Sequence, residues 1–182
     1  SLLITHAGLP SGSVGQDLSP SRDEGVIVSR PKQHNDGEGE VWKTAIKKTV
    51  DDLKKNIGAE NMSVGISAPG LPNKENTAIA FMPGRLEGLE NFNWSDYLQS
   101  PVCVLNDGVA ALVAEAKTGA AKESTNAILV TLGTGVGGAL LINKQPYQGS
   151  FNKAGHIGHM VIDSADDCDV TGMPGSLEEC IG

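Results

Sequence analysis

A run of six residues that contains four glycines, "GTGVGG" at 133–138, constrains the fold of this chain more than any other feature. The segment "AILVTL" precedes the run and "ALLIN" follows it, and both are apolar and partly β-branched, which favours strands. The pattern G-x-G-x-x-G is formally that of a dinucleotide-binding loop, but such a loop opens a helix. The Lys-Ser or Lys-Thr pair of a P-loop does not follow. The sequence therefore predicts a glycine turn between two strands.

The glycine turn has two interpretations that the residues alone leave open. Backbone N–H groups that have no Cβ beside them can face a phosphate, and Thr134 would add a hydroxyl. A plain hairpin turn explains the same glycines, because glycine is common wherever the chain turns tightly.

A second polar feature lies where an expected strand passes into an expected helix. "PVCVLN" predicts a buried strand that ends at Asn106, and "DGVAALVAEAKTG" predicts a helix from Asp107 that ends at Gly119. Polar residues at the carboxyl ends of strands in α/β folds face the ligand crevice, where an Asp can accept a proton from a substrate hydroxyl. Asn106 could donate to a neighbouring hydroxyl. Helix capping by Asp107 is the alternative, although Ala110, three positions on, completes no capping box.

The remaining elements mix helix with strand. Residues 41–57 carry apolar side chains at helical spacing and precede Gly58, so we expect a helix there. Strands are expected at "GVIVS", "MSVGISAPG", "TAIAFMPG" and "HIGHMVID", and a short helix at "WSDYLQS". Residues 1–40 are otherwise rich in turn formers and weak in pattern. This mixture indicates an α/β fold.

The composition argues against some classes of binding partner and indicates a cellular compartment. The 182 residues suffice for one domain or two small lobes, and the net charge of -8 opposes binding to nucleic acid and to anionic membranes. Three cysteines (Cys103, Cys168 and Cys180) form no CxxC pair, so we expect free thiols in a reducing compartment. Neither a signal peptide nor a membrane-spanning apolar run is recognisable, and we expect a cytoplasmic protein.

Three segments together resemble one known family. "VLNDGVAALVAEAKTGAA", "LVTLGTGVGGALLINKQPYQGSFNKAGHIGH" and "GMPGSLE" resemble the ROK family of bacterial sugar kinases and sugar-responsive repressors. "VGISAPG" and "FMPGRLEGLENFNW" match it more loosely, so the resemblance covers residues 64–182. It implies an actin-like ATPase (ribonuclease H-like) α/β fold, with a mixed sheet and flanking helices, that is incomplete here. It also implies an N-terminal lobe at 1–105 and the start of a C-terminal lobe at 106–182.

The resemblance implies an ATP-dependent sugar kinase that phosphorylates a hexose or a related sugar on a hydroxyl group. In such kinases the Asp after Asn is the general base, which here is Asp107, and Mg²⁺ accompanies ATP. The sugar-binding residues that it implies are Asn106, His156, His159, Glu178 and Gly84. The residues that it implies for the phosphates of ATP are Gly133, Thr134, Gly135, Gly137 and Gly138.

Two departures from the family pattern concern the histidine segment. His156 stands where the family has Glu, and a neutral imidazole accepts one hydrogen bond where a carboxylate accepts two, so the sugar need not be glucose. A structural, hydrogen-bonded histidine is the alternative. Many members also carry a cysteine-rich zinc motif, whose cysteine positions, aligned on "GSLE", hold Asp169, Thr171 and Ser176 here.

Structural zinc needs four tetrahedral nitrogen or sulfur ligands, and the aligned residues provide too few. On the strand expected at "HIGHMVID", the two histidines would also point to opposite faces. We therefore expect no structural zinc and no other metal ligand, and we expect "DSADDCD" to form a flexible turn.

Residues 1–40 show no counterpart of the Asp-x-Gly-Gly-Thr phosphate turn with which the family opens, and family members continue well past the final Leu-Glu. Two alternatives to an active kinase are therefore a non-catalytic sugar-sensing module, like the family's repressors, and an inactive fragment. The resemblance further suggests a homodimer.

Overall fold

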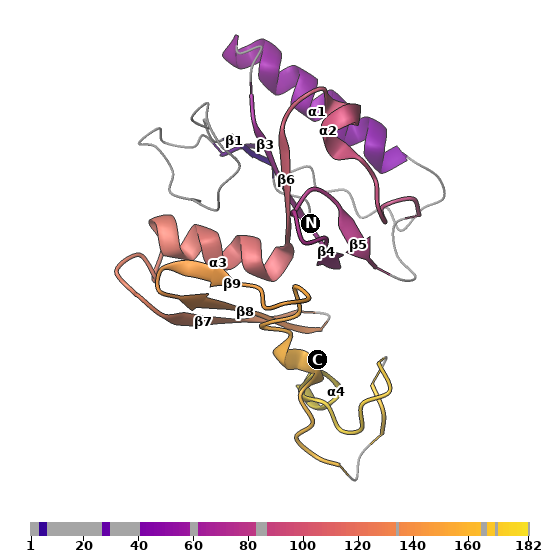
Figure 1. The fold of residues 1–182 in the computed structure, drawn as a ribbon, viewed down its shortest axis with the longest axis vertical. Coiled ribbons are helices and arrows are strands. Elements are labelled where there is room, and N and C mark those ends of the chain that lie inside the picture. Colours follow the sequence, from indigo (N-terminus) through magenta and orange to yellow (C-terminus); the bar gives the residue numbers. More distant parts are fainter. Residues whose placement is uncertain are drawn as a thin grey trace. The chain divides into compact units, whose positions relative to one another are not determined.

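The computed structural model describes residues 4–6, 27–29, 41–58, 62–82, 87–133, 135–164, 167–169 and 171–181 (Figure 1). The chain divides into two compact units, Ser1–Asp107 and Gly108–Gly182. Both units combine helices with strands, which confirms the α/β class. None of the helices in the described ranges has the length and apolar character needed to cross a membrane.

A four-stranded mixed sheet lies at the centre of the first unit. β1 (Ile4–His6) lies antiparallel between β2 (Ile27–Ser29) and β3 (Val64–Ala68), and β3 pairs in parallel with β6 (Val102–Asn106). The register aligns Ala68 with Asn106, so β3 and β6 end at the same edge of the sheet. β4 (Leu71–Pro72) and β5 (Ile79–Phe81) form a separate two-stranded ribbon.

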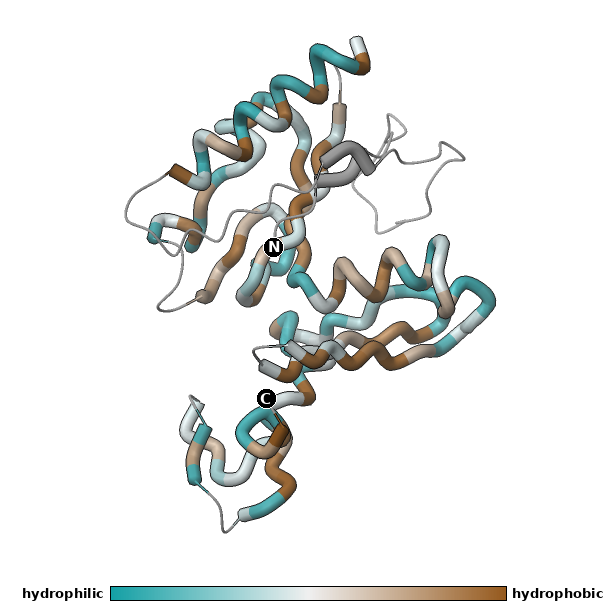
Figure 2. The backbone as a smooth tube through the Cα atoms, turned by 180° about the vertical axis from the view of Figure 1, so that it is seen from behind, coloured by the Kyte–Doolittle hydropathy of each residue, from teal (hydrophilic) through white to brown (hydrophobic). Residues whose placement is uncertain are grey.

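The expected helix at 41–57 is confirmed as α1 (Val41–Ile57). Figure 2 shows the apolar and polar residues alternating along it as in an amphipathic helix. Its buried apolar side chains follow the helical period and join the core with β3 and β6; they are Trp42, Ile46, Val50 and Leu53. The helix ends where the N–H of Gly58 donates to the carbonyl of Lys54 (3.0 Å).

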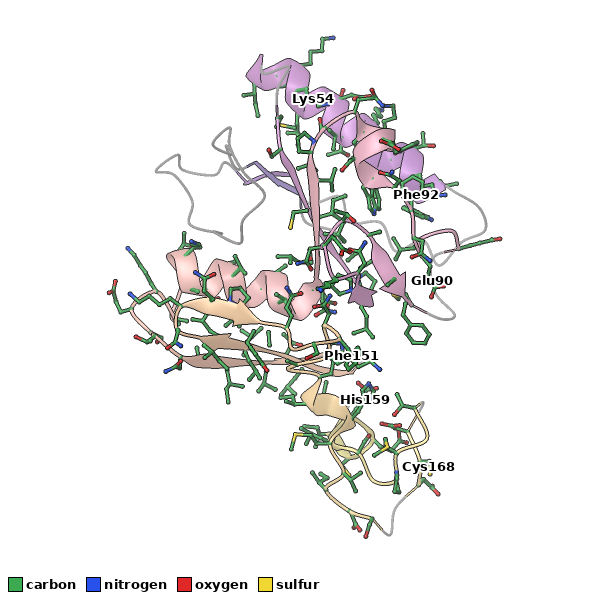
Figure 3. The ribbon with its side chains drawn as sticks, viewed as in Figure 1. Lys54, Glu90, Phe92, Phe151, His159 and Cys168 are labelled. Atoms are coloured by element: carbon green, nitrogen blue, oxygen red, sulfur yellow. The ribbon has the colours of Figure 1, made fainter. Side chains whose placement is uncertain are left out.

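The short helix expected at "WSDYLQS" is α2 (Trp94–Leu98), whose N-terminus is capped by the side chain of Asn93. Trp94 is fully buried and packs edge-on against Phe92, with ring centroids 4.9 Å apart. Phe92 is labelled in Figure 3. Lys54 of α1 donates from Nζ to the carbonyl of Leu98 (3.0 Å) and so joins the two helices.

The second unit contains a three-stranded antiparallel sheet of β7 (Ala127–Leu132), β8 (Val136–Ile142) and β9 (Gln145–Tyr147). α3 (Asp107–Thr118) lies along one face of this sheet, and the β7–β8 hairpin is largely hydrophobic (Figures 1 and 2). Leu132 pairs with Val136, which confirms a turn at the glycines between two strands.

The prediction of a strand at "HIGHMVID" is wrong. Residues 157–159 form a 3₁₀ turn, η1 (Ile157–His159), in which the N–H of Met160 donates to the carbonyl of Ile157 (3.0 Å). Close packing on β8 explains the difference, because a Cβ on Gly158 would overlap the carbonyl oxygen of Val136. The last described element is the short helix α4 (Leu177–Ile181), whose N-terminus is capped by Ser176 Oγ, which accepts from the N–H of Glu179 (3.2 Å).

Candidate functional site

Asn106 and Asp107 occupy the junction between β6 and α3, as the sequence predicts. Asn106 is 9% exposed, and its Nδ2 donates to the carbonyl of Gly70 (3.0 Å), in the bend that follows β3. This bond ties together the adjacent carboxyl ends of two parallel strands, and it gives the amide of Asn106 a fixed orientation.

Asp107 is exposed and lies in the first turn of α3, while the next two residues, Gly108 and Val109, are buried. Accessibility to substrate is what a general base needs, and the first turn is also where an acidic side chain interacts favourably with the helix dipole. Both interpretations of Asp107 therefore stay predictions.

The glycine hairpin holds a carboxylate. Glu178 Oε2 accepts a hydrogen bond from the N–H of Val136 (2.9 Å), the first residue of β8. A Cβ on Gly135 would lie 2.5 Å from that oxygen, so glycine is what allows the approach. The turn itself is closed by the N–H of Gly133, which donates to the carbonyl of Gly135 (3.0 Å). The hairpin and the final Leu-Glu, two segments of the family pattern, thus meet in the second unit.

The other glycines of the run have different surroundings. Gly137 and Gly138 belong to β8, and a Cβ on Gly138 would lie 2.6 Å from the carbonyl oxygen of Gly155. Packing against a neighbouring backbone is therefore one role of Gly138. Thr134 and Gly84, expected at the phosphates and at the sugar, lie outside the described residues.

His159 is joined to a buried carboxylate. Nδ1 of His159, which is labelled in Figure 3, lies 2.9 Å from Asp169 Oδ2. The side chain of Asp169 is 1% exposed and that of His159 is 33% exposed. The second oxygen, Asp169 Oδ1, accepts from Thr171 Oγ1 (2.7 Å) and from the N–H groups of Thr171 (2.8 Å) and Met173 (3.1 Å). We call His159, Asp169 and Thr171 the Asp169 cluster.

These hydrogen bonds determine the charge state of Asp169. The Thr171 hydroxyl bond contributes most; together with the bonds from His159 and the two backbone N–H groups, it holds the pKa of Asp169 well below its usual range. Burial of this carboxyl group raises its pKa, but the hydrogen bonds outweigh that effect. The carboxylate is therefore ionised and can only accept hydrogen bonds.

His156 lies immediately before the 3₁₀ turn that ends at His159, so the expectation that a strand directs the two imidazoles to opposite faces is wrong. The side chain of His156 is half-buried, and its backbone N–H donates to the carbonyl of Lys153 (3.3 Å). His156, His159 and Glu178 all belong to the second unit, as does the glycine hairpin.

The residues at the aligned positions of the zinc motif do not fit a structural zinc ion. The aligned cysteine positions hold oxygen donors, and His159 Nδ1 is already bonded to one of them, Asp169. Over the described ranges, no group of three or more His, Cys, Asp or Glu side chains is arranged to hold a metal ion. Cys168 is exposed, and all three cysteines are free thiols, as expected.

The sequence interpretation missed the role of Asp169, which it assigned to a flexible acidic turn. A local signal was present: in Asp-x-Thr an Asp side chain commonly accepts from the backbone N–H two residues on, as Asp169 does from Thr171. The partner at His159, ten residues earlier, leaves no such mark in the sequence.

Comparison with known proteins gives one family. The ROK family model matches residues 22–181. The glucokinase of Streptomyces coelicolor is 34% identical over 141 residues, which are 76% of this chain and 44% of that enzyme. The xylose repressor of Bacillus subtilis is 36% identical over 111 residues, which are 56% of this chain and 27% of the repressor.

A similar solved structure is that of a ROK family glucokinase from Streptomyces griseus in complex with glucose and AMPPNP. It matches with a TM-score of 0.63 and 28% identity over 78% of this chain and 45% of that one. The chain thus spans less than half the length of these relatives. The likeness confirms the actin-like ATPase fold, and the chain belongs to the ROK family.

Proposed function

We propose that this chain is part of an ATP-dependent sugar kinase that phosphorylates a hexose or a related sugar. The observation that carries the proposal is the Asn106–Asp107 pair, in which an exposed carboxylate directly follows a buried, oriented amide at a strand-to-helix junction. The family and the 34% identity with a glucokinase support the same reaction class.

In the proposed reaction Asp107 takes the proton from a sugar hydroxyl. The hydroxyl oxygen then bonds to the γ-phosphorus of ATP, and the bond from that phosphorus to the bridging oxygen breaks, which releases ADP. Mg²⁺, when bound with ATP, would neutralise phosphate charge. Phosphoryl transfer depends mainly on positioning and charge stabilisation, so few side chains need to take part in the chemical step.

The proposed sugar ligands are Asn106, His156, His159 and Glu178. Glu178 engages the hairpin through Oε2, which leaves the other carboxylate oxygen to accept a hydroxyl hydrogen bond. For the phosphates we propose the tip of the hairpin, where Gly133 is exposed and a Cβ would meet no other atom within 4 Å.

A non-catalytic sugar sensor is the second candidate. The 36% identity with the xylose repressor of Bacillus subtilis favours it. In that case the sugar ligands remain in use, and Asp107 serves as a ligand or a helix cap without accepting a proton in catalysis.

The test uses the full-length protein, a panel of sugars, and separate measurements of sugar binding and ATP consumption. We expect Asp107→Asn to leave sugar affinity within about threefold and to lower turnover by about 10²–10⁴-fold or more, the usual contribution of a general base. Asp52→Asn, a change at an exposed carboxylate of α1, is the matched control and should retain full activity. Binding without turnover in the unaltered protein would support the sensor.

A further inference from the structure

The two oxygens of Asp169 have separate tasks. Oδ1 accepts from Thr171 Oγ1 and from two backbone N–H groups, those of Thr171 and Met173, and so fixes the loop around it. Oδ2 faces His159 Nδ1 at 2.9 Å. One oxygen therefore organises the backbone, and the other is directed at an imidazole.

This division fixes the proton of the imidazole. Because the ionised carboxylate can only accept, His159 Nδ1 must carry the hydrogen of their shared bond. In a neutral imidazole the other nitrogen, Nε2, is then unprotonated and is an acceptor. A carboxylate behind a functional histidine commonly sets the tautomer and the ring orientation in this way.

We propose that Asp169 is a positioning residue, which holds His159 in the Nδ1-protonated tautomer and so presents Nε2 as an acceptor for a sugar hydroxyl. The inference rests on the proposed role of His159 as a sugar ligand. The same carboxylate connects His159 to the loop at Thr171, so the position of the imidazole depends on the Asp169 cluster.

The variant Asp169→Asn tests the tautomer with little change in shape. Three donors converge on Oδ1, so the introduced amide must place its oxygen there and direct its NH₂ group at His159 Nδ1. Nδ1 must then accept, and the hydrogen moves to Nε2. The variant therefore keeps the three hydrogen bonds to Oδ1 and moves the imidazole hydrogen from Nδ1 to Nε2.

Long-range ¹H–¹⁵N NMR of the 182-residue chain, at a pH where imidazoles are neutral, identifies the protonated nitrogen. The His159 signals are assigned by their loss in His159→Gln. We expect Nδ1–H in the unaltered chain and Nε2–H in Asp169→Asn. Thr171→Val is the matched control: it removes a bond to Oδ1 but leaves the His159 contact, so Nδ1–H should persist. Nε2–H in the unaltered chain, or one tautomer in both proteins, would overturn the proposal.

A sugar titration of the full-length protein separates this inference from the proposed function. If a sugar binds, Asp169→Asn should lower the affinity for it by about tenfold, which is the contribution of one hydrogen bond. Thr171→Val should lower the affinity by less than about threefold. Equal affinity of Asp169→Asn and the unaltered protein would show that sugar binding does not depend on Nε2 as an acceptor. If no sugar binds while the tautomer inverts, the kinase proposal fails and the positioning of His159 by Asp169 stands. Stoichiometric zinc bound through His159 would contradict the role of Asp169.

Discussion

The carboxylate of Glu178 accepts a hydrogen bond from the backbone N–H of Val136 at 2.9 Å, across 42 residues of sequence. The contact joins the last helix to the start of β8, and it depends on the absence of a side chain at Gly135. A charged group is thereby held against the glycine hairpin by one identifiable bond.

Replacing Gly135 with Ala should break that bond. The new Cβ would lie 2.5 Å from Glu178 Oε2, and because this oxygen ends a flexible side chain it can rotate away, so the cost is limited to the hydrogen bond, about 1 kcal/mol of unfolding free energy. Gly133→Ala, where a Cβ meets nothing within 4 Å, is the control and should change stability by less than about 0.5 kcal/mol. Urea denaturation of both variants measures the difference, and equal losses would contradict the contact.

Stability should fall in acid through Asp169. The folded protein holds the pKa of this carboxyl below its ordinary value of 3.8, so its contribution is complete above about pH 4 and is lost as the pH falls further. Asp169→Asn cannot ionise and should lack this component. Thermal midpoints of both proteins between about pH 2 and 6 should therefore converge towards the acid end. A gap that stays constant with pH would exclude a preferentially ionised Asp169 in the folded state.

Trp94 should be the most sensitive aromatic position of the first unit. It is fully excluded from solvent and packs against Trp42 and Phe92, with ring centroids 5.5 and 4.9 Å away. Trp94→Ala should cost about 3–5 kcal/mol, because it leaves a cavity that the surrounding strands and helices close only in part. Phe81→Ala, at a residue that is 57% exposed, should cost less than about 1 kcal/mol. Denaturant titrations followed by circular dichroism compare the two.

The outward side of β7 should promote self-association of the 182-residue chain. Ile128 and Leu132 are 70% and 71% exposed, and the exposed Val130 lies between them on the same face. The double variant Ile128→Lys/Leu132→Lys should weaken association at least about tenfold, because it removes two large apolar side chains from the contact and adds like charges. Ala120→Lys/Ser150→Lys adds the same charge at exposed positions and should have little effect. Sedimentation equilibrium gives the association constants, and equal changes would point to charge alone.

Local patterns predicted most of the elements. The helix that ends before Gly58, the strand that ends at Asn106 and the glycine hairpin each depend on apolar periodicity and a nearby stop signal, and all three are confirmed. β1 was missed because Ile4–His6 is too short for an alternating pattern, and its pairing with β2 and β3 defines it instead.

The failures concern contacts between distant segments. "HIGHMVID" has the apolar content of a strand, but the approach of Gly155 and Gly158 to β8 imposes a 3₁₀ turn. The His159–Asp169 hydrogen bond likewise could not be predicted from the sequence, because neither residue alone indicates the other. For the candidate site, the sequence indicated the residues and the family, while their roles at the sugar and the phosphates stay predictions.

The backbone of the segment after β9 packs directly against the backbone of β8. At Gly138 the obstacle to a side chain is the carbonyl oxygen of Gly155, and at Gly158 it is the carbonyl oxygen of Val136. A carbonyl group is present whatever residue carries it, so trimming a neighbouring side chain makes no room. Genetic selections should therefore recover true revertants at these two positions and few second-site suppressors.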